Sequence, residues 1–205
     1  MNNHDLLYRP LLSGTSIINA RVNEPGTIGY VAQDNTGAHW IISCYHVLCE
    51  VNLGSYVADE PIYQPAAVTA QNLVATTSSQ RANRLLDCAA AKCEPGQQGT
   101  NYQLGIGPTA APVVPAMGMR VLKAGAESGV TEGDIITVNG NEVVIRVVSN
   151  YPVGYEISDP GDSGSLWVEQ QSRAPVALHT GKSTPLRAAA FRFDAVLAAL
   201  SLSPL

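Results

Sequence analysis

The chain has 205 residues, of which 45% are hydrophobic, and it carries a formal net charge of −5 at pH 7. This length allows one domain with a substantial core. The acidic balance, without a basic cluster or interleaved aromatic and basic residues, argues against nucleic-acid binding. No apolar run approaches the roughly 20 residues that a membrane-spanning helix needs, so we also expect no membrane association.

The first half of the chain reads as a series of short strands. The 18 glycines and 13 prolines divide the whole sequence into brief segments, which favours an all-β fold. Residues 61–84 are rich in Gln, Asn, Thr and Ser without clear periodicity, and we expect a loop with one strand there. The strands predicted in this half are residues 26–33, 38–44, 54–59 and 85–91.

The second half begins after an apolar, proline-containing segment at residues 105–116, which we expect to lie on the protein surface as a connection. The Asn139-Gly140 dipeptide predicts a tight hairpin turn. Residues 132–143 also resemble a hairpin of the PDZ module, but too little chain is available for that module, so we expect a plain hairpin. The strands predicted in this half are residues 117–124, 133–139, 142–149, 153–158, 164–169 and 175–181.

The end of the chain has helical periodicity. Phe193, Val196, Leu197 and Leu200 recur at i, i+3, i+4 and i+7, which predicts an amphipathic helix. Asp194 would lie in its first turn, where a negative charge interacts favourably with the helix dipole.

The most informative motif is Asp-Pro-Gly-Asp-Ser-Gly-Ser at residues 159–165. Ser163 between two glycines is typical of a nucleophile on a tight turn. Gly161 has no Cβ, so its amide can turn toward a developing oxyanion, and the Ser163 amide supplies a second donor. Serine needs a base that a carboxylate orients. His46 ends an apolar run and Asp87 lies among apolar residues, which gives the order His, Asp, Ser along the chain.

These motifs resemble the trypsin-like serine peptidases, particularly bacterial intracellular members, and the resemblance covers nearly the whole chain. It implies that His46 is the general base, Asp87 the acid that orients it and Ser163 the nucleophile. It also implies an oxyanion hole formed by the amides of Gly161 and Ser163. The expected fold is two six-stranded antiparallel β-barrels with a C-terminal α-helix. The expected single domain, residues 1–205, divides into a first barrel (1–104), a crossover (105–116), a second barrel (117–191) and the helix (192–205).

The aspartate inside the serine motif needs a cation of its own. The resemblance implies that Asp162 is buried beside the nucleophile, where an unpaired carboxylate would be costly. Relatives activated by cleavage supply a new N-terminal ammonium, but no suitable apolar N-terminus is evident. Lys123 is the internal candidate and Arg120 the second. The alternative is that Lys123 is an ordinary solvated strand residue.

The resemblance also locates a primary specificity pocket. Ile157 stands where trypsin-type members keep an aspartate, so no preference for Lys or Arg is expected. Members that cleave after glutamate, and viral relatives that cleave after glutamine, carry a histidine where His179 falls. His179 and the Ser158 hydroxyl can donate hydrogen bonds to a carbonyl or carboxylate, and Lys182 would favour an acidic side chain. The expected pocket residues are Ile157, Ser158, Pro160, His179, Thr180, Gly181 and Lys182.

This pocket predicts a preference for Glu or Gln before the scissile bond. The alternative is an apolar pocket in which His179 packs as a neutral strand residue and Ile157 selects Leu, Phe or Met.

Four cysteines occur as two pairs, Cys44 with Cys49 and Cys88 with Cys93. The start of the chain lacks the features of a signal peptide, so we expect a cytoplasmic protein with four free thiols. A Cys₄ zinc site and a disulfide between Cys49 and Cys93 are the alternatives.

The sequence therefore predicts a serine endopeptidase that acts on protein or peptide substrates and needs no metal or organic cofactor. A regulatory protein partner is possible for such a protein. Two alternatives are a catalytically silent fold that serves as a protein-binding module and a zinc-stapled structural protein.

Overall fold

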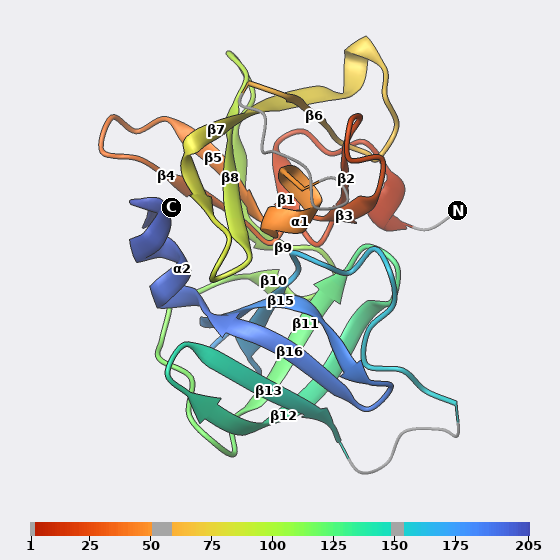
Figure 1. Cartoon of the computed structure of the whole chain (residues 1–205), viewed down its shortest axis with the longest axis vertical. Coiled ribbons are helices and arrows are strands. Elements are labelled where there is room, and N and C mark those ends of the chain that lie inside the picture. Colours follow the sequence, from red (N-terminus) through yellow and green to blue (C-terminus); the bar gives the residue numbers. More distant parts are fainter. Residues whose placement is uncertain (1–2, 51–58, 149–153) are drawn as a thin grey trace.

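The computed structural model describes residues 3–50, 59–148 and 154–205 and is almost entirely β-structure (Figure 1). The two halves of the chain form two β units that lie one above the other in Figure 1, and helix α2 lies beside their junction. The short connecting helices are η1 (Asn3–Asp5), α1 (Tyr45–Leu48) and η2 (Ala70–Asn72).

The first unit contains an eight-stranded sheet, whose strand β17 comes from the end of the chain, and a small three-stranded sheet. The eight strands follow the order β17-β4-β5-β8-β7-β6-β2-β3, and the small sheet follows β1-β9-β10, with β1 parallel to β9. Their bounds are β1 (Leu11–Ser13), β2 (Ser16–Asn19), β3 (Pro25–Thr27), β4 (Tyr30–Gln33), β5 (His39–Ser43), β6 (Pro61–Tyr63), β7 (Leu73–Asn83), β8 (Cys88–Cys93), β9 (Gly99–Gln103), β10 (Gly107–Pro108) and β17 (Ser203–Pro204).

The second half is a closed barrel in the order β11-β12-β13-β16-β15-β14. Alternate residues of β13 point inward, so Val143 and Ile145 are buried while Glu142 and Arg146 are exposed. The barrel interior also holds Trp167, which is completely buried. The bounds are β11 (Arg120–Gly125), β12 (Gly129–Asn139), β13 (Glu142–Val147), β14 (Leu166–Glu169), β15 (Pro175–Thr184) and β16 (Arg187–Arg192).

The predicted all-β, two-barrel class is confirmed, and the structure refines its details. The second barrel is closed and six-stranded, whereas the first is an open eight-stranded sheet accompanied by a small sheet. The hairpin turn at Asn139 and Gly140 is confirmed, because Asn139 pairs with Glu142 and Gly140 has a φ of 58°. Residues 154–158 form no strand, and residues 54–58 lie outside the described residues.

The strands that were not predicted are β1, β2, β9, β10, β16 and β17. Residues 26–33, predicted as one strand, form β3 and β4 with a break at Ile28 and Gly29. At this break the chain changes its hydrogen-bond partner: the Ile28 amide donates to the carbonyl of Thr15, beside β2, and the Gly29 amide donates to the carbonyl of Ile42 in β5.

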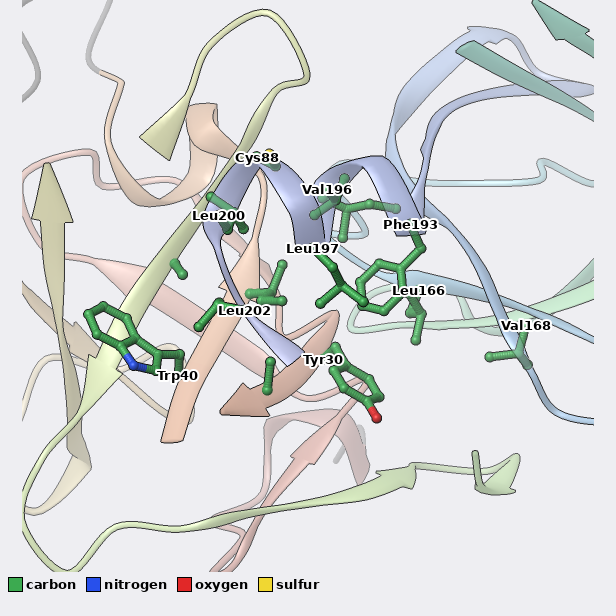
Figure 2. Close-up of a cluster of buried hydrophobic side chains, with 14 of the residues drawn as sticks. Tyr30, Trp40, Cys88, Leu166, Val168, Phe193, Val196, Leu197, Leu200 and Leu202 are labelled. Carbon is green, nitrogen blue, oxygen red and sulfur yellow. The ribbon is translucent and has the colours of Figure 1, made fainter. Parts of the chain in front are cut away.

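Helix α2 (Phe193–Leu200) joins the two β units rather than covering the second barrel alone. It packs against β15 and β16 of the second unit and β7 and β8 of the first. Figure 2 shows Phe193 and Leu197 directed toward Tyr30 of β4 and Leu166 of β14. The rings of Tyr30 and Phe193 meet edge to face, with centroids 5.3 Å apart. Fully burying one such side chain contributes about 1.5–3 kcal/mol, so the helix fixes the position of one unit against the other.

The helix ends earlier than predicted. Ser201 adopts a left-handed conformation with a φ of 52° and its amide bonds back to the helix. Such a residue terminates a helix because it cannot continue the right-handed turn. Ser203 and Pro204 then form β17, which pairs with β4, so the predicted helical range 192–205 was too long.

All four cysteines carry free thiols, and the alternative disulfide between Cys49 and Cys93 is not formed. Cys44, Cys49 and Cys88 are buried, and Cys93 is partly buried. No helix in the described ranges is both long and apolar enough to cross a bilayer.

Candidate active site

His46 and Asp87 form a close pair at one edge of the first unit. His46 lies in α1, directly after β5, and Asp87 lies in the turn between β7 and β8 with a φ of 43°. The Nδ1 atom of His46 is 2.7 Å from Oδ2 of Asp87, and the His46 amide donates to Oδ1 at 3.1 Å. Two bonds to one carboxylate fix the ring orientation. Because Nδ1 carries the proton that faces the carboxylate, Nε2 is left as the basic nitrogen.

The charges around His46 favour its protonated form. Burial lowers the pKa of His46, but the hydrogen bond and charge of Asp87, together with Glu24 and Glu50, outweigh it and raise that pKa. The side chains of His46 and Asp87 remain 34% and 24% exposed, so a substrate can reach them.

Ser163 lies on a turn with two glycines in left-handed conformations. The φ angles of Gly161 and Gly164 are 108° and 89°, which glycine adopts readily. A Cβ at Gly164 would collide with the Ser43 side chain and lie 2.6 Å from the carbonyl oxygen of Thr27. Within the described part of the chain, the amides of Gly161 and Ser163 have no hydrogen-bond acceptor. Two free donors next to a hydroxyl are what an oxyanion hole needs.

Thr27 attaches this turn to the first unit. Its amide donates to the Ser163 carbonyl at 2.9 Å, and its hydroxyl donates to the Gly161 carbonyl at 2.8 Å. The same hydroxyl accepts from the Ala126 amide at 3.0 Å, and the Thr27 carbonyl accepts from the Ser43 hydroxyl at 2.8 Å. Thr27 was not among the predicted site residues, since a threonine in a short strand has no motif of its own.

Asp162 is completely buried and bonded on every side. Lys123, also completely buried, places Nζ 2.7 Å from Oδ2 of Asp162, so the predicted pair is present. The Ser128 hydroxyl and amide and the Glu127 and Asp159 amides donate the remaining bonds. Burial alone would raise the pKa of Asp162, but Lys123 and Ser128 lower it to about 2.

Arg120, the second candidate for this role, lies on the outside of the barrel. Its guanidinium pairs with Asp134 at 2.7 Å and with Glu132 at 3.2 Å. Successive residues of a strand point to opposite faces, so Arg120 and Lys123, three apart on β11, point in opposite directions. Only Lys123 therefore reaches the interior.

His46 and Ser163 line one pocket of about 350 Å³, together with Glu24, Pro25, Val47, Pro160 and Gly161. The hydrogen bond of the Ser163 hydroxyl goes to the Thr180 carbonyl at 3.4 Å, and within the described residues it makes none to His46. His46 and Ser163 thus meet at one surface depression, and Asp87, which is not part of its lining, is bonded to His46. The Ser163 hydroxyl is turned toward β15.

A second pocket of about 190 Å³ adjoins Ser163 on the other side. Of the predicted pocket residues, Ser158, Pro160, Gly181 and Lys182 line it, and Asp159 lines it as well. Ile157 and His179 are completely buried and do not line it, and Ile157 packs in the core of the second barrel. The Thr180 hydroxyl donates to the carbonyl of Ala189 at 3.2 Å rather than into the pocket.

His179 lies behind Ser158. Its Nε2 atom is 2.7 Å from the Ser158 hydroxyl oxygen, and its Nδ1 atom accepts from Trp167 Nε1 at 3.4 Å. Burial, together with the charge of Lys123, lowers the pKa of His179 to about 3. The ring is therefore neutral at physiological pH, and of these two residues only Ser158 lines the pocket.

Lys182 does not face the pocket as an unpaired cation. Its ammonium is bonded to Glu156 and lies 3.7 Å from Asp159. The favourable field for an acidic side chain that the sequence suggested is therefore reduced by two neighbouring carboxylates.

One group of potential metal ligands occurs among the described residues: Cys44, His46 and Asp87, whose ligand atoms lie within 4.8 Å of one another. Its histidine and aspartate already bond each other. Burial raises the pKa of the Cys44 thiol well above its ordinary value, which opposes the thiolate that a metal requires. The four cysteines do not gather into a zinc site in the described ranges.

No family model and no curated protein sequence matches the chain. Solved structures do match. A glutamic acid-specific serine protease, described as using a novel histidine triad in substrate binding, aligns over 95% of this chain and 100% of its own, with a TM-score of 0.72 and 15% identity. Cellulomonas bogoriensis chymotrypsin aligns over 95% of this chain and 97% of its own, with a TM-score of 0.66 and 16% identity. Nocardiopsis protease aligns over 94% of this chain and 97% of its own, with a TM-score of 0.64 and 14% identity. The chain therefore has the chymotrypsin fold that these serine proteases share.

Proposed function

We propose that this protein is a serine endopeptidase that cleaves peptide bonds through an acyl-enzyme. The observation that carries the proposal is the 2.7 Å contact between His46 Nδ1 and Asp87 Oδ2 in a pocket that Ser163 also lines. A histidine held in this way has one free ring nitrogen, which is the arrangement a general base needs.

In this mechanism, His46 takes the proton of the Ser163 hydroxyl as Oγ attacks the substrate carbonyl carbon. The amides of Gly161 and Ser163 bind the resulting oxyanion. His46 then gives the proton to the leaving amine, and the C–N bond breaks. A water molecule next gives a proton to His46 as its oxygen attacks the ester carbon. His46 then gives that proton to Oγ of Ser163 as the ester C–O bond breaks, which releases the acid product and the free serine. Asp87 stabilises the imidazolium in both halves of the cycle.

The second candidate function is a catalytically silent fold that binds a protein partner. The observation in its favour is that the Ser163 hydroxyl bonds the Thr180 carbonyl and not His46. A serine side chain moves readily between staggered rotamers, and contacts between nucleophile and base often tighten only when substrate binds. The peptidase is therefore the better supported function. A regulatory partner that turns Ser163 toward His46 is compatible with it.

We further propose that the pocket beside Ser163 accepts a Glu or Gln side chain before the scissile bond. The support is the Ser158 hydroxyl, backed by His179, at the pocket wall. The glutamic acid-specific protease with the same fold is consistent with this preference. A cleavage profile on a peptide library tests it. A dominant apolar or basic residue at this position would contradict the proposal, as would unchanged selectivity in His179→Ala.

A cytoplasmic location is a further part of the proposal, supported by the four free thiols. Hydrolysis of a peptide library by the purified protein, with Ser163→Ala as control, tests the activity itself. The proposal predicts cleavage by the wild type and none by Ser163→Ala. A folded wild-type protein that cleaves no peptide, alone or with cell extract added, would favour the silent fold.

A further inference from the structure

A buried chain of hydrogen bonds runs from Trp167 through His179 to Ser158 and ends at the pocket beside Ser163. The indole of Trp167 and the ring of His179 are both completely buried, with centroids 6.0 Å apart and planes at 72°. Trp167 Nε1 donates to His179 Nδ1 at 3.4 Å, and His179 Nε2 lies 2.7 Å from the Ser158 hydroxyl oxygen.

The direction of every hydrogen bond in this chain follows from its first member. An indole nitrogen can only donate a hydrogen bond, so the facing Nδ1 of His179 must be the acceptor. A neutral imidazole then carries its proton on Nε2 and donates it to Ser158. Because the Ser158 oxygen accepts this bond, its own hydrogen is available to a ligand in the pocket.

The surroundings also exclude a charged His179. Burial and the positive charges of Lys123 and His46 lower the pKa of His179, and the charge of Asp162 opposes them only in part. Lys123 Nζ lies 5.6 Å from the centre of the Trp167 ring, so a second cation next to it would be repelled. The donor at the pocket wall is therefore uncharged.

The charges at the pocket mouth disfavour an acidic ligand as well. Lys182 is engaged by Glu156 and lies 3.7 Å from Asp159, so two carboxylates and one ammonium leave a net negative charge. A ligand carboxylate would be repelled there. A carboxamide would instead accept from the Ser158 hydroxyl through its oxygen and could donate from its NH₂ to a carboxylate such as Asp159, which lines the pocket.

We propose that Trp167 is a positioning residue that holds His179 as the neutral Nε2–H form, so that the pocket selects glutamine over glutamate before the scissile bond. This inference rests on the proposed peptidase function and narrows its Glu or Gln preference to one residue. The glutamic acid-specific protease with the same fold uses a histidine triad. In the described part of this chain, the buried partner of His179 Nδ1 is an indole instead.

Nuclear magnetic resonance of protein with ¹⁵N-labelled histidine tests the protonation directly and requires no activity. His179 is assigned by comparison with His179→Gln. We expect one proton, on Nε2, throughout the range from pH 5 to pH 8. A proton on Nδ1, or a doubly protonated ring in that range, would overturn the inference even if the protein is an active peptidase.

Three matched peptides with Gln, Glu or Met before the scissile bond test the selectivity. We expect kcat/KM for the Gln peptide to exceed that for the Glu peptide about tenfold or more, since a carboxylate finds no free cation. Equal or better cleavage of the Glu peptide would refute the preference. Failure to cleave all three, with no cleavage in a library, would count against the proposed function and not specifically against the tautomer.

Variants identify the residues responsible. Trp167→Phe keeps a buried ring but removes the N–H, so the ratio of kcat/KM for Gln to that for Met should fall about tenfold, mainly through KM. Trp40→Phe removes a buried indole N–H in the other unit, bonded to Asp34, and should leave the ratio unchanged. Asp159→Asn, a substitution at a half-exposed side chain, should raise Glu cleavage relative to Gln. If Trp167→Phe leaves the Gln-to-Met ratio unchanged, Trp167 is not the positioning residue and the inference is wrong. If Asp159→Asn leaves the Glu-to-Gln ratio unchanged, the charge of Asp159 does not disfavour Glu and that part of the inference is wrong.

Discussion

The amide of Thr27 donates a hydrogen bond of 2.9 Å to the carbonyl of Ser163, which connects β3 of the first unit directly to the nucleophile turn of the second. The hydroxyl of Thr27 adds a bond to Gly161 and accepts one from Ala126. The conformation of the serine turn, and with it the direction of its free amides, therefore depends on the contact between the two units.

Replacing Thr27 with valine should weaken this connection while preserving side-chain volume. It removes the bonds of the Thr27 hydroxyl to the Gly161 carbonyl and the Ala126 amide, and loss of such buried bonds costs about 1–3 kcal/mol of folding free energy. We expect kcat to fall more than KM rises, because the oxyanion donors are displaced. Urea unfolding and steady-state kinetics measure both effects.

Thr131→Val is the matched control, because the Thr131 hydroxyl is buried and has no hydrogen-bond partner among the described residues. Removing such a hydroxyl should be neutral or slightly stabilising. Equal behaviour of the two valine variants would show that the Thr27 hydroxyl does not hold the turn.

The buried ion pair of Lys123 and Asp162 should be needed for both stability and activity. Lys123→Met leaves Asp162 charged and buried, which should lower the free energy of unfolding by about 3–5 kcal/mol and disorder the serine turn. Adding Asp162→Asn should recover part of the stability, because no unpaired charge then remains. Unfolding curves of both variants measure these changes.

Arg120→Met removes an exposed cation from the same strand and serves as the control. Its ion pairs with Asp134 and Glu132 are at the surface and screened by solvent, so we expect little change in the free energy of unfolding. If Lys123→Met were as stable and as active as Arg120→Met, the pair would not support the nucleophile.

The pH dependence should report on the charges near His46. Glu24 raises the pKa of His46, and only the neutral ring can act as the base. Glu24→Gln should therefore lower that pKa and move the acidic limb of the kcat/KM profile to lower pH. Glu142→Gln, at an exposed residue of the second barrel, should leave the limb in place. A shift to higher pH in Glu24→Gln would contradict this electrostatic description.

The predicted triad residues should act as a unit. Ser163→Ala and His46→Ala should each abolish hydrolysis without unfolding the protein. Asp87→Asn should lower kcat by about 10⁴-fold, because an amide in place of the carboxylate favours the wrong tautomer of His46. Wild-type turnover in any of the three variants, measured on a good peptide substrate, would refute the assignment.

The resemblance carried by the motif order was enough to predict the fold. The structure pairs His46 with Asp87 and places His46 and Ser163 at one pocket, as the motif order suggested. The three predicted triad residues follow strands or lie in tight turns whose apolar flanks are visible in the sequence. Strand β16 was not predicted because its centre, residues 188–190, consists of alanines. Alanine does not produce the alternation of apolar and polar residues by which a half-buried strand is recognised.

The contacts that tune the site were harder to predict. Thr27 and Trp167 act through bonds to residues that are distant in sequence or on the neighbouring strand, and no local pattern marks them. The sequence suggested that Lys182 would favour acidic ligands. Its pairing with Glu156 could not be foreseen, because Glu156 lies 26 residues earlier in the sequence. Burial and pairing across strands therefore decide the charge of the pocket, and single-residue chemistry does not.

The most direct test of the central claim is labelling of the purified protein with a fluorophosphonate, followed by mass spectrometry of the labelled peptide. The proposed function predicts covalent modification of Ser163 alone, its absence in Ser163→Ala and its severe slowing in His46→Ala. A folded protein that takes up no label, or carries it on another residue, would contradict the claim that Ser163 is an activated nucleophile.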